Sequence, residues 1–182
     1  MKSGAVLVFA LLLFARAAGA EAPASQLKIF VSEQKLVLLR DGRAVKEYPV
    51  STSKFGTGNR QLSQKTPTGR HTIARKIGAG SPAMTVFRNR VRTAETAKVN
   101  RSRRPSGDDL ITTRILWLRG LEPGVNSGKR VDSFHRLIYI HGTPDEGLIG
   151  TPASHGCIRM KNRDVVDLFD RVEPGTPVEI VP

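Results

Sequence analysis

Short runs of apolar residues, several of them alternating with polar ones, recur along the chain after residue 26 and predict strands rather than helices. The first runs cover residues 27–31 and 35–40, and Asp41-Gly42 after them is a strong hairpin signal. We therefore expect three strands joined by tight turns at the start of the fold. The predicted strands lie at residues 27–31, 35–40, 44–50, 71–74, 110–118, 137–140 and 178–181.

One segment near the C-terminus has the apolar spacing of a helix instead. Val165, Val166, Leu168, Phe169 and Val172 recur with roughly helical periodicity, which predicts a helix over residues 163–171. Asn162 or a neighbour is the expected cap, and Pro174-Gly175 ends the helix. One short helix among many strands indicates a mainly β fold.

Residues 75–108 show the least regular pattern. Large apolar residues are few there, and basic side chains crowd the second half of the segment. We expect an exposed insertion or long loop, which in a compact domain is either functional or mobile. Its basic residues are Arg88, Arg90, Arg92, Lys98, Arg101, Arg103 and Arg104.

The N-terminus has the pattern of a secretory signal peptide. Lys2 precedes an apolar run over residues 5–14, and an Ala-Gly-Ala site ends at Ala20. An uncleaved anchor helix is the alternative, but the run falls short of the roughly 20 apolar residues that a spanning helix needs. We predict a signal peptide over residues 1–20 and a single domain over residues 21–182, with no transmembrane segment after cleavage and a location in the periplasm or cell wall.

The formal net charge of +13 favours anionic partners. Outside the cytoplasm, anionic wall polymers or lipid headgroups are better candidates than nucleic acid. The basic stretch also lacks the aromatic residues on which single-stranded nucleic acid stacks. A solvated basic surface without a partner remains the alternative for most of these side chains.

The chemistry concentrates on the only cysteine and two histidines. His141 ends a predicted strand, and Cys157 follows a Gly- and Pro-rich loop that can bring the two together. An imidazole can take the thiol proton and later return a proton to a leaving group. Gly156 tolerates a strained backbone and leaves room for a substrate carbonyl beside backbone N–H groups. A lone cysteine in an exported chain is already a candidate reactive thiol.

Three other interpretations of the cysteine stay open on the residues alone. Cys157 could be a small buried apolar residue, although its Gly and His neighbours make a poor core. It could form a zinc site with His141 and His155, but a fourth ligand and a catalytic Glu at motif spacing are missing. An intermolecular disulfide is the third possibility.

The longer string around these residues resembles a known family. Ile-His-Gly-Thr at 140–143 and Ser-His-Gly-Cys-Ile-Arg-Met at 154–160 are similar to the signature of the L,D-transpeptidase catalytic domain, also called YkuD. Thr-Pro-Thr-Gly at 66–69 resembles the turn that precedes the signature. The resemblance runs from about residue 27 to residue 181.

This resemblance implies a sandwich-like β fold and a cysteine acyl enzyme without cofactor or metal. Family members cleave a peptidoglycan tetrapeptide stem before its terminal D-Ala, and a neighbouring stem's amine resolves the thioester as a 3→3 cross-link. Cys157 would be the nucleophile, His141 the base, and the Gly142 carbonyl would orient it. Backbone N–H groups near Gly156 and Cys157 are the expected oxyanion donors. The residues that would form the oxyanion site or line the pocket are Gly142, Ser154, His155, Gly156 and Arg159.

Two departures and two rival functions accompany the resemblance. Arg159 stands where many members carry Asn, which affects substrate contacts, and the basic stretch exceeds the family minimum. Attack by water on the same thioester would give an L,D-carboxypeptidase or endopeptidase. A non-catalytic wall-binding domain would not need His141, Gly156 and Cys157 together. The acceptor, which could be a peptide stem, a lipoprotein lysine or a free D-amino acid, and the oligomeric state stay open.

Overall fold

Residues 25–182 are described by a computed structural model of the chain. The predicted signal peptide lies outside these residues, so its assignment stays a prediction. Within them, no helix is long and apolar enough to cross a bilayer. The elements are β1 (Ser25–Phe30), β2 (Lys35–Arg40), β3 (Arg43–Ser51), β4 (Gly69–Ile77), β5 (Thr85–Arg88), β6 (Val91–Thr96), β7 (Ile111–Gly120), β8 (Tyr139–Gly142), the 3-10 turn η1 (Glu146–Leu148), β9 (Ile158–Met160), α1 (Asn162–Phe169) and β10 (Pro177–Val181).

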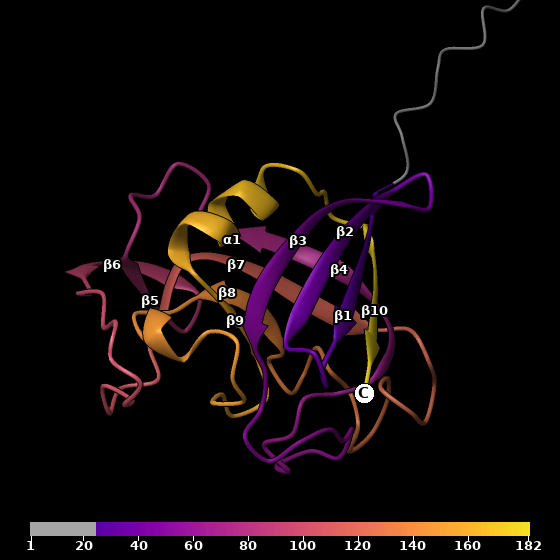
Figure 1. The fold of residues 1–182 in the computed structure, drawn as a ribbon. Coiled ribbons are helices and arrows are strands. Elements are labelled where there is room, and N and C mark those ends of the chain that lie inside the picture. The colour runs from indigo at the N-terminus through magenta and orange to yellow at the C-terminus, as the bar shows by residue number, and fades with distance from the viewer. Residues whose placement is uncertain (1–24) are drawn as a thin grey trace, which may run out of the picture.

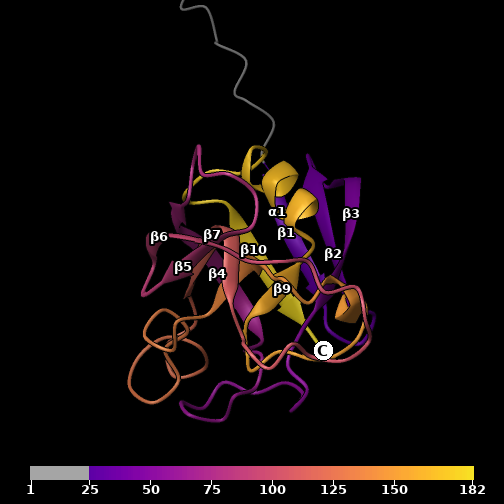
Figure 2. The same cartoon turned by 90° about the vertical axis from the view of Figure 1, so that its left-hand side faces the viewer.

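The strands form one sheet that folds back on itself. Their order is β4-β10-β1-β2-β3-β9-β8-β7-β5-β6, and β4 also pairs with β7. The extra pairing closes eight strands into a flattened barrel, and the β5–β6 hairpin extends from β7 outside the ring. The predicted mainly β, sandwich-like fold with one C-terminal helix is confirmed (Figures 1 and 2).

Two apolar clusters lie on opposite faces of β7 and β8. The larger one fills the barrel with residues such as Leu116 and Ile140, and α1 covers it with Val165 and Leu168. Figure 1 shows α1 across the top of the layers. The smaller cluster uses the alternate positions of the same strands, because successive side chains of a strand point to opposite faces. Its members are Phe87, Ile115, Trp117 and Tyr139, with Ile77, Ile111, Phe134 and Cys157 packed against them.

The prediction of a long irregular insertion over residues 75–108 is wrong in its first part. β4 extends to Ile77, and β5 and β6 form a hairpin whose turn residues Asn89 and Arg90 both have positive φ. Positive φ at both central residues is typical of the tight turns that join hairpin strands. The segment has few apolar residues because β6 is mostly exposed, and β5 is held by pairing with β7. The irregular parts are the loop at residues 78–84 and the segment 97–110.

Three local features can be compared with the prediction. The strand expected at 137–140 begins at Tyr139 and ends at Gly142, because Leu137 has positive φ and precedes the ladder. The helix cap was expected at Asn162 or a neighbour: Lys161 is the N-cap, and Asn162 is the first, buried residue of α1. The three-residue strand β9 after Cys157 was not predicted, since it is too short to show a period.

Candidate active site

Cys157 lies at the end of a tight turn that immediately precedes β9. The Ser154 hydroxyl accepts a hydrogen bond from the Gly156 N–H (3.2 Å) and donates one to the Cys157 carbonyl (2.6 Å). Gly156 has φ +127°, a conformation that L side chains rarely adopt. Its carbonyl accepts a hydrogen bond from the Thr66 hydroxyl (3.1 Å). The turn is therefore held from both sides, and the backbone beside the thiol is fixed in place.

The Cys157 sulfur is partly exposed and has two polar neighbours. It accepts a hydrogen bond from the Tyr139 N–H (3.4 Å) and donates one to the Leu137 carbonyl (3.4 Å). Burial against the smaller apolar cluster raises the pKa of the thiol to about 11, although the Tyr139 N–H contact lowers it. At neutral pH Cys157 is therefore a protonated thiol, and a reaction at the sulfur needs a base to remove this proton.

His141 lies on β8, next to the turn that carries the thiol. The parallel pairing of β8 with β9 sets His141 opposite Arg159 and Ile140 opposite Ile158. Because side chains alternate along both strands, His141 and Arg159 share the face on which Cys157 precedes β9. No hydrogen bond joins the Cys157 sulfur to the His141 ring in residues 25–182. The structure thus brings the two predicted residues to one face of adjacent strands.

The tautomer of His141 follows from its hydrogen bond. Nδ1 lies 2.8 Å from the Gly142 carbonyl oxygen, which can only accept, so Nδ1 carries the proton. The ring is 2% exposed. Burial lowers the pKa of His141 to about 4, and the Gly142 carbonyl only partly offsets this effect. The imidazole is therefore neutral near pH 7, and the unprotonated Nε2 is available as a base.

Gly142 occupies a position with no room for a side chain. A Cβ there would lie 2.7 Å from both the Asn162 Oδ1 and the Thr112 carbonyl oxygen. The Asn162 amide accepts hydrogen bonds from the Thr112 and Thr113 hydroxyls and donates to the Thr143 carbonyl and Glu146. This buried network presses against the residue whose carbonyl holds His141. The sequence analysis singled out Gly142 but considered Asn162 only as a possible helix cap. Its contact with Gly142 was missed, because a polar residue at the start of a helix is common.

An acidic residue that the sequence analysis missed connects two of the predicted pocket residues. Asp109 uses separate oxygens to accept a hydrogen bond from His155 Nδ1 (2.7 Å) and to pair with Arg159 Nη2 (2.5 Å). Burial raises the pKa of Asp109, but Arg159, His141 and His155 outweigh it and the pKa lies below its usual value. No local motif marks Asp109, because it comes from the irregular segment 97–110.

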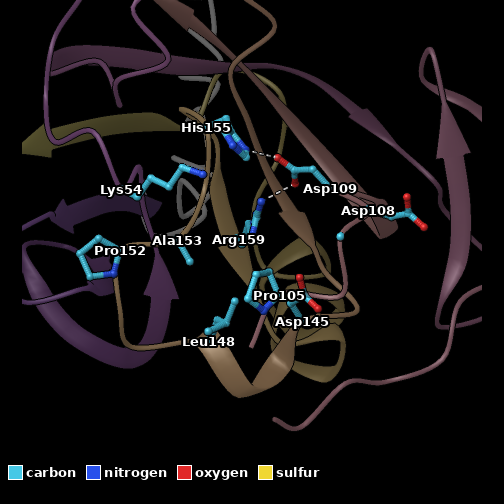
Figure 3. A pocket seen from close by; sticks show the side chains of 11 residues that line it. Lys54, Pro105, Asp108, Asp109, Asp145, Leu148, Pro152, Ala153, His155 and Arg159 are labelled. Carbon is cyan, nitrogen blue, oxygen red and sulfur yellow. Dashed lines mark hydrogen bonds and ion pairs between the residues drawn. The ribbon is translucent and has the colours of Figure 1, made fainter. Parts of the chain in front are cut away.

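His155 and Arg159 also line a cavity of about 250 Å³ beside the thiol-bearing turn. Figure 3 shows Arg159 in the middle of the lining and Lys54 extending inward from the wall opposite Asp109. The rest of the lining consists of the apolar residues Pro105, Leu148, Pro152 and Ala153, the carboxylates Asp108 and Asp145, and Gly107. The cavity is thus a mixed site with charged groups of both signs.

Two arginines that the sequence analysis did not place in the site also lie beside it. Arg136 donates to the Gly58 (3.1 Å) and Lys65 (2.6 Å) carbonyls and so holds the loop that packs against Gly156. Arg90, expected to lie in the exposed basic stretch, donates to the Tyr139 hydroxyl (3.3 Å) and covers the Trp117 ring at 5.0 Å. Part of the basic stretch therefore belongs to the wall of the site.

The residues 25–182 contain no group of three or more His, Cys, Asp or Glu side chains placed to hold a metal ion. His155 is turned toward Asp109, and His141 toward its own strand. What the arrangement offers chemically is a thiol, a neutral imidazole and a fixed turn.

The imidazole on β8 and the thiol immediately before the adjacent strand β9 form a candidate cysteine–histidine site in a closed β fold. A family model described as the L,D-transpeptidase catalytic domain, YkuD, matches residues 25–180. The chain belongs to this family.

Individual relatives agree with this assignment. The putative L,D-transpeptidase YkuD of Bacillus subtilis (strain 168) is 28% identical over 153 residues, which cover 84% of this chain and 63% of the relative. The putative L,D-transpeptidase YkuD of Bacillus licheniformis is 54% identical over 43 residues, 24% of this chain and 26% of the relative. These matches span less than two thirds of each relative.

A solved structure supports the fold. L,D-transpeptidase 3 from Mycobacterium tuberculosis, in complex with a faropenem-derived adduct, superimposes with a TM-score of 0.53 at 17% identity. The match covers 88% of this chain and 61% of that chain. At this identity the likeness concerns the fold alone.

Proposed function

We propose that this protein is a peptidoglycan L,D-transpeptidase in which Cys157 is the nucleophile and His141 the general base. The observation that carries the proposal is the neutral imidazole of His141, locked by the Gly142 carbonyl on the same strand face as the thiol. The export signal expected at residues 1–20 would deliver the enzyme to the periplasm or cell wall, where stem peptides are found. The family assignment supports this activity.

The first half-reaction forms a thioester. Nε2 of His141 takes the thiol proton as the sulfur attacks the carbonyl carbon of the diamino acid in a tetrapeptide stem. The carbonyl electrons move to oxygen, and the C–N bond to D-Ala then breaks as His141 returns the proton to the leaving nitrogen. Because the thiol pKa is about 11 and the imidazole pKa about 4, the proton moves during attack rather than before it.

Backbone donors near the sulfur would stabilise the negative oxygen of this intermediate. The Gly156 N–H already donates to the Ser154 hydroxyl, so in this conformation it is engaged. The Cys157 N–H is then the better candidate of the two expected donors. The Ser154 hydroxyl acts by holding the turn, because it joins the Gly156 N–H to the Cys157 carbonyl.

The second half-reaction transfers the acyl group. A neutral side-chain amine of a neighbouring stem attacks the thioester, and His141 takes a proton from that amine. As the C–S bond breaks, His141 passes this proton to the sulfur, which regenerates the thiol. The product is a 3→3 cross-link. Water in place of the amine would give a tripeptide, which is the carboxypeptidase alternative. Both outcomes use the same thiol and imidazole.

The experiment is a product analysis with purified tetrapeptide muropeptides. The native protein is expected to produce a cross-linked dimer with release of D-Ala, and Cys157→Ala is expected to produce none while its circular dichroism spectrum is unchanged. A tripeptide as the only product would establish hydrolysis instead. Comparable turnover in Cys157→Ala would refute the nucleophile assignment.

A carbapenem adds an independent test of the thiol. A β-lactam carbonyl resembles the scissile amide, and the Mycobacterium tuberculosis relative was solved with a faropenem-derived adduct. Intact-mass spectrometry of the native protein with imipenem is expected to show one adduct, absent in Cys157→Ala. A native protein that reacts with iodoacetamide but not with imipenem would contradict a transpeptidase-like pocket.

A further inference from the structure

The cavity lined by His155 and Arg159, which stand two residues before and two residues after Cys157, contains a buried cation whose hydrogen bonding is incomplete. Arg159 has a side chain only 5% exposed; its Nη2 pairs with Asp109, and its Nε has no hydrogen-bond partner in residues 25–182. A buried guanidinium N–H without a partner is costly. The planar guanidinium is suited to an anion with two oxygens, such as a carboxylate. Arg159 therefore has capacity for a further oxygen ligand in a cavity of about 250 Å³.

A second positive group enters the same space. Lys54 is exposed, and no ion pair in the described part of the chain involves its ammonium group. Figure 3 shows its side chain extending toward His155 from the wall opposite Asp109. Lys54 and Arg159 thus approach the cavity from different sides.

Three carboxylates also line the cavity, but only one faces the cations. Asp145 is buried and accepts hydrogen bonds from Asn100 and the Ser106 N–H. Asp108 points away from the other labelled side chains in Figure 3. Asp109 is the carboxylate that contacts Arg159, and it lies on the irregular segment rather than on a strand. Asp109 therefore occupies the position beside Arg159 that the carboxylate of an anionic ligand would take.

The position of Arg159 relates the cavity to one side of the substrate. Arg159 lies directly opposite His141 in the β8–β9 register. In the proposed reaction His141 gives its proton to the leaving nitrogen, so the leaving residue lies on this side of the thiol. The carboxylate of that residue is two bonds from the nitrogen. Pro152 and Ala153 supply an apolar wall for a small side chain.

We infer that the cavity built on Arg159 and Lys54 binds the terminal carboxylate of the released residue, with Asp109 holding Arg159 until the substrate arrives. This inference rests on the proposed function, because it uses the leaving side defined by His141. It assigns Arg159 and Lys54 to substrate recognition and makes Asp109 a positioning residue. The same site also serves the second half-reaction, since the attacking amine must approach where the leaving amine departed. Acceptors with a carboxylate on the amine-bearing carbon are then preferred.

The test compares two stems, a tetrapeptide and the same peptide with its terminal carboxylate amidated. Affinity for the full-length Cys157→Ala protein is measured by calorimetry, and KM is measured on the native enzyme. A lost charge-assisted hydrogen bond corresponds to about a tenfold to hundredfold weaker binding, so the amide is expected to bind that much less well. A third stem, amidated on its γ-linked glutamate instead, is expected to bind like the unmodified peptide.

Variants then assign the effect to residues. Lys54→Met and Arg159→Lys are each expected to reduce the acid-to-amide ratio several-fold, and Lys54→Met tests the site even if Arg159→Lys fails to fold. Asp109→Asn is expected to tighten binding of the acid and leave the amide unchanged, whereas a purely structural role would weaken both. Arg43→Met, which removes one charge from the exposed β2–β3 hairpin, is the matched control.

Each result decides a separate point. Equal binding of acid and amide overturns the subsite, and so does a ratio that neither Lys54→Met nor Arg159→Lys changes. If amidation of the γ-linked glutamate weakens binding instead, the cavity binds a different part of the stem, and the inference is also overturned. If Cys157→Ala discriminates the two stems but the native protein releases no D-Ala, the subsite stands and the proposed transfer fails. If the native protein turns over both stems without discriminating between them, the transfer stands and the subsite fails.

Discussion

At the scale of single residues, the site keeps its two reactive groups neutral. Burial raises the pKa of Cys157 to about 11 and lowers the pKa of His141 to about 4, which disfavours a preformed thiolate–imidazolium pair. The Gly142 carbonyl holds the imidazole proton on Nδ1 and leaves Nε2 free. In the proposed mechanism, His141 therefore takes the thiol proton only when the sulfur attacks a substrate carbonyl.

The pH dependence of thiol alkylation tests this division of roles. For the native protein we expect the rate with iodoacetamide to rise once His141 is deprotonated, above about pH 4, and again as the thiol ionises near pH 11. In His141→Ala the first rise should disappear and the second remain. Alkylation is followed by mass spectrometry, with circular dichroism as the control for folding. Coincident profiles for the two proteins would show that His141 is not the activator.

The same shifts predict how stability varies with pH. His141 has a lowered folded-state pKa, so below its ordinary pKa of 6.5 the unfolded chain binds the extra proton and stability falls as pH drops toward 4. The loss is on the order of 3 kcal/mol at most. Cys157 has a raised pKa, so stability falls as pH rises from 9 toward 11. Maximum stability should lie between these windows.

Urea denaturation at a series of pH values measures both slopes. Cys157→Ala should make the alkaline loss shallower, with a remainder because burial also raises the pKa of Tyr48 and Tyr139. His141→Ala should make the acid loss shallower. Some acid loss remains in His141→Ala, because burial also lowers the pKa of His71. An unchanged acid slope in His141→Ala would contradict a buried neutral imidazole.

At the scale of elements, the site depends on how α1 begins. Asn162 opens the helix, and its amide makes four side-chain hydrogen bonds, with Thr112, Thr113, Thr143 and Glu146. These contacts join α1 to β7, to the end of β8 and to η1. Gly142 packs against the same amide, so the network supports the carbonyl that orients His141.

Asn162→Ala is therefore expected to destabilise the fold by about 2–4 kcal/mol, because it leaves several buried polar groups without partners. Arg163→Ala is the matched control, since Arg163 follows on the same helix, is exposed and pairs only with its neighbour Asp164. Chemical denaturation of both variants gives the difference. A loss for Asn162→Ala no larger than for Arg163→Ala would mean that the network contributes little.

At the scale of the whole molecule, the basic residues divide into two groups. Arg90 contacts Tyr139 and Trp117 in the wall of the site, whereas Arg92, Arg101 and Arg103 are exposed. A net charge of +13 on a small protein attracts polyanions over long distances, and salt screens this attraction beyond about 10 Å near 0.1 M. The exposed group is the part available to an anionic wall polymer.

Replacing Arg92, Arg101 and Arg103 with Gln should therefore weaken sedimentation with purified sacculi, and the native protein should lose binding as salt rises. Turnover of a soluble tetrapeptide should stay nearly unchanged in this variant. Arg90→Gln is expected to lower turnover of the soluble tetrapeptide and to leave sacculus binding nearly unchanged, because it removes the hydrogen bond to Tyr139, whose N–H contacts the thiol. Equal sacculus binding by the triple variant and the native protein would show that these arginines are simply solvated.

The sequence alone was sufficient for the family and the class of fold. It also supplied the proposed chemistry, because a thiol and an imidazole near glycines, as at Cys157 and His141, carry their reactivity in their residue types. The strands of the barrel were predictable where apolar periodicity was strong, as in residues 35–40 and 110–118. The family followed from the same short motifs, and the family model agrees with it.

Only the tertiary structure decided which distant residues surround that chemistry. Asp109 reaches Arg159 and His155 because the chain just before β7 lies beside β9 and the turn that precedes it. These contacts join residues some fifty positions apart that share no local pattern. Asn162 and Arg136 donate hydrogen bonds to backbone carbonyls of other segments. The residue types along the chain do not predict these contacts. The β5–β6 hairpin forms because β7 supplies a pairing edge, not because its own sequence is apolar. Long-range pairing and burial are properties of the closed sheet, so they cannot be read along the chain.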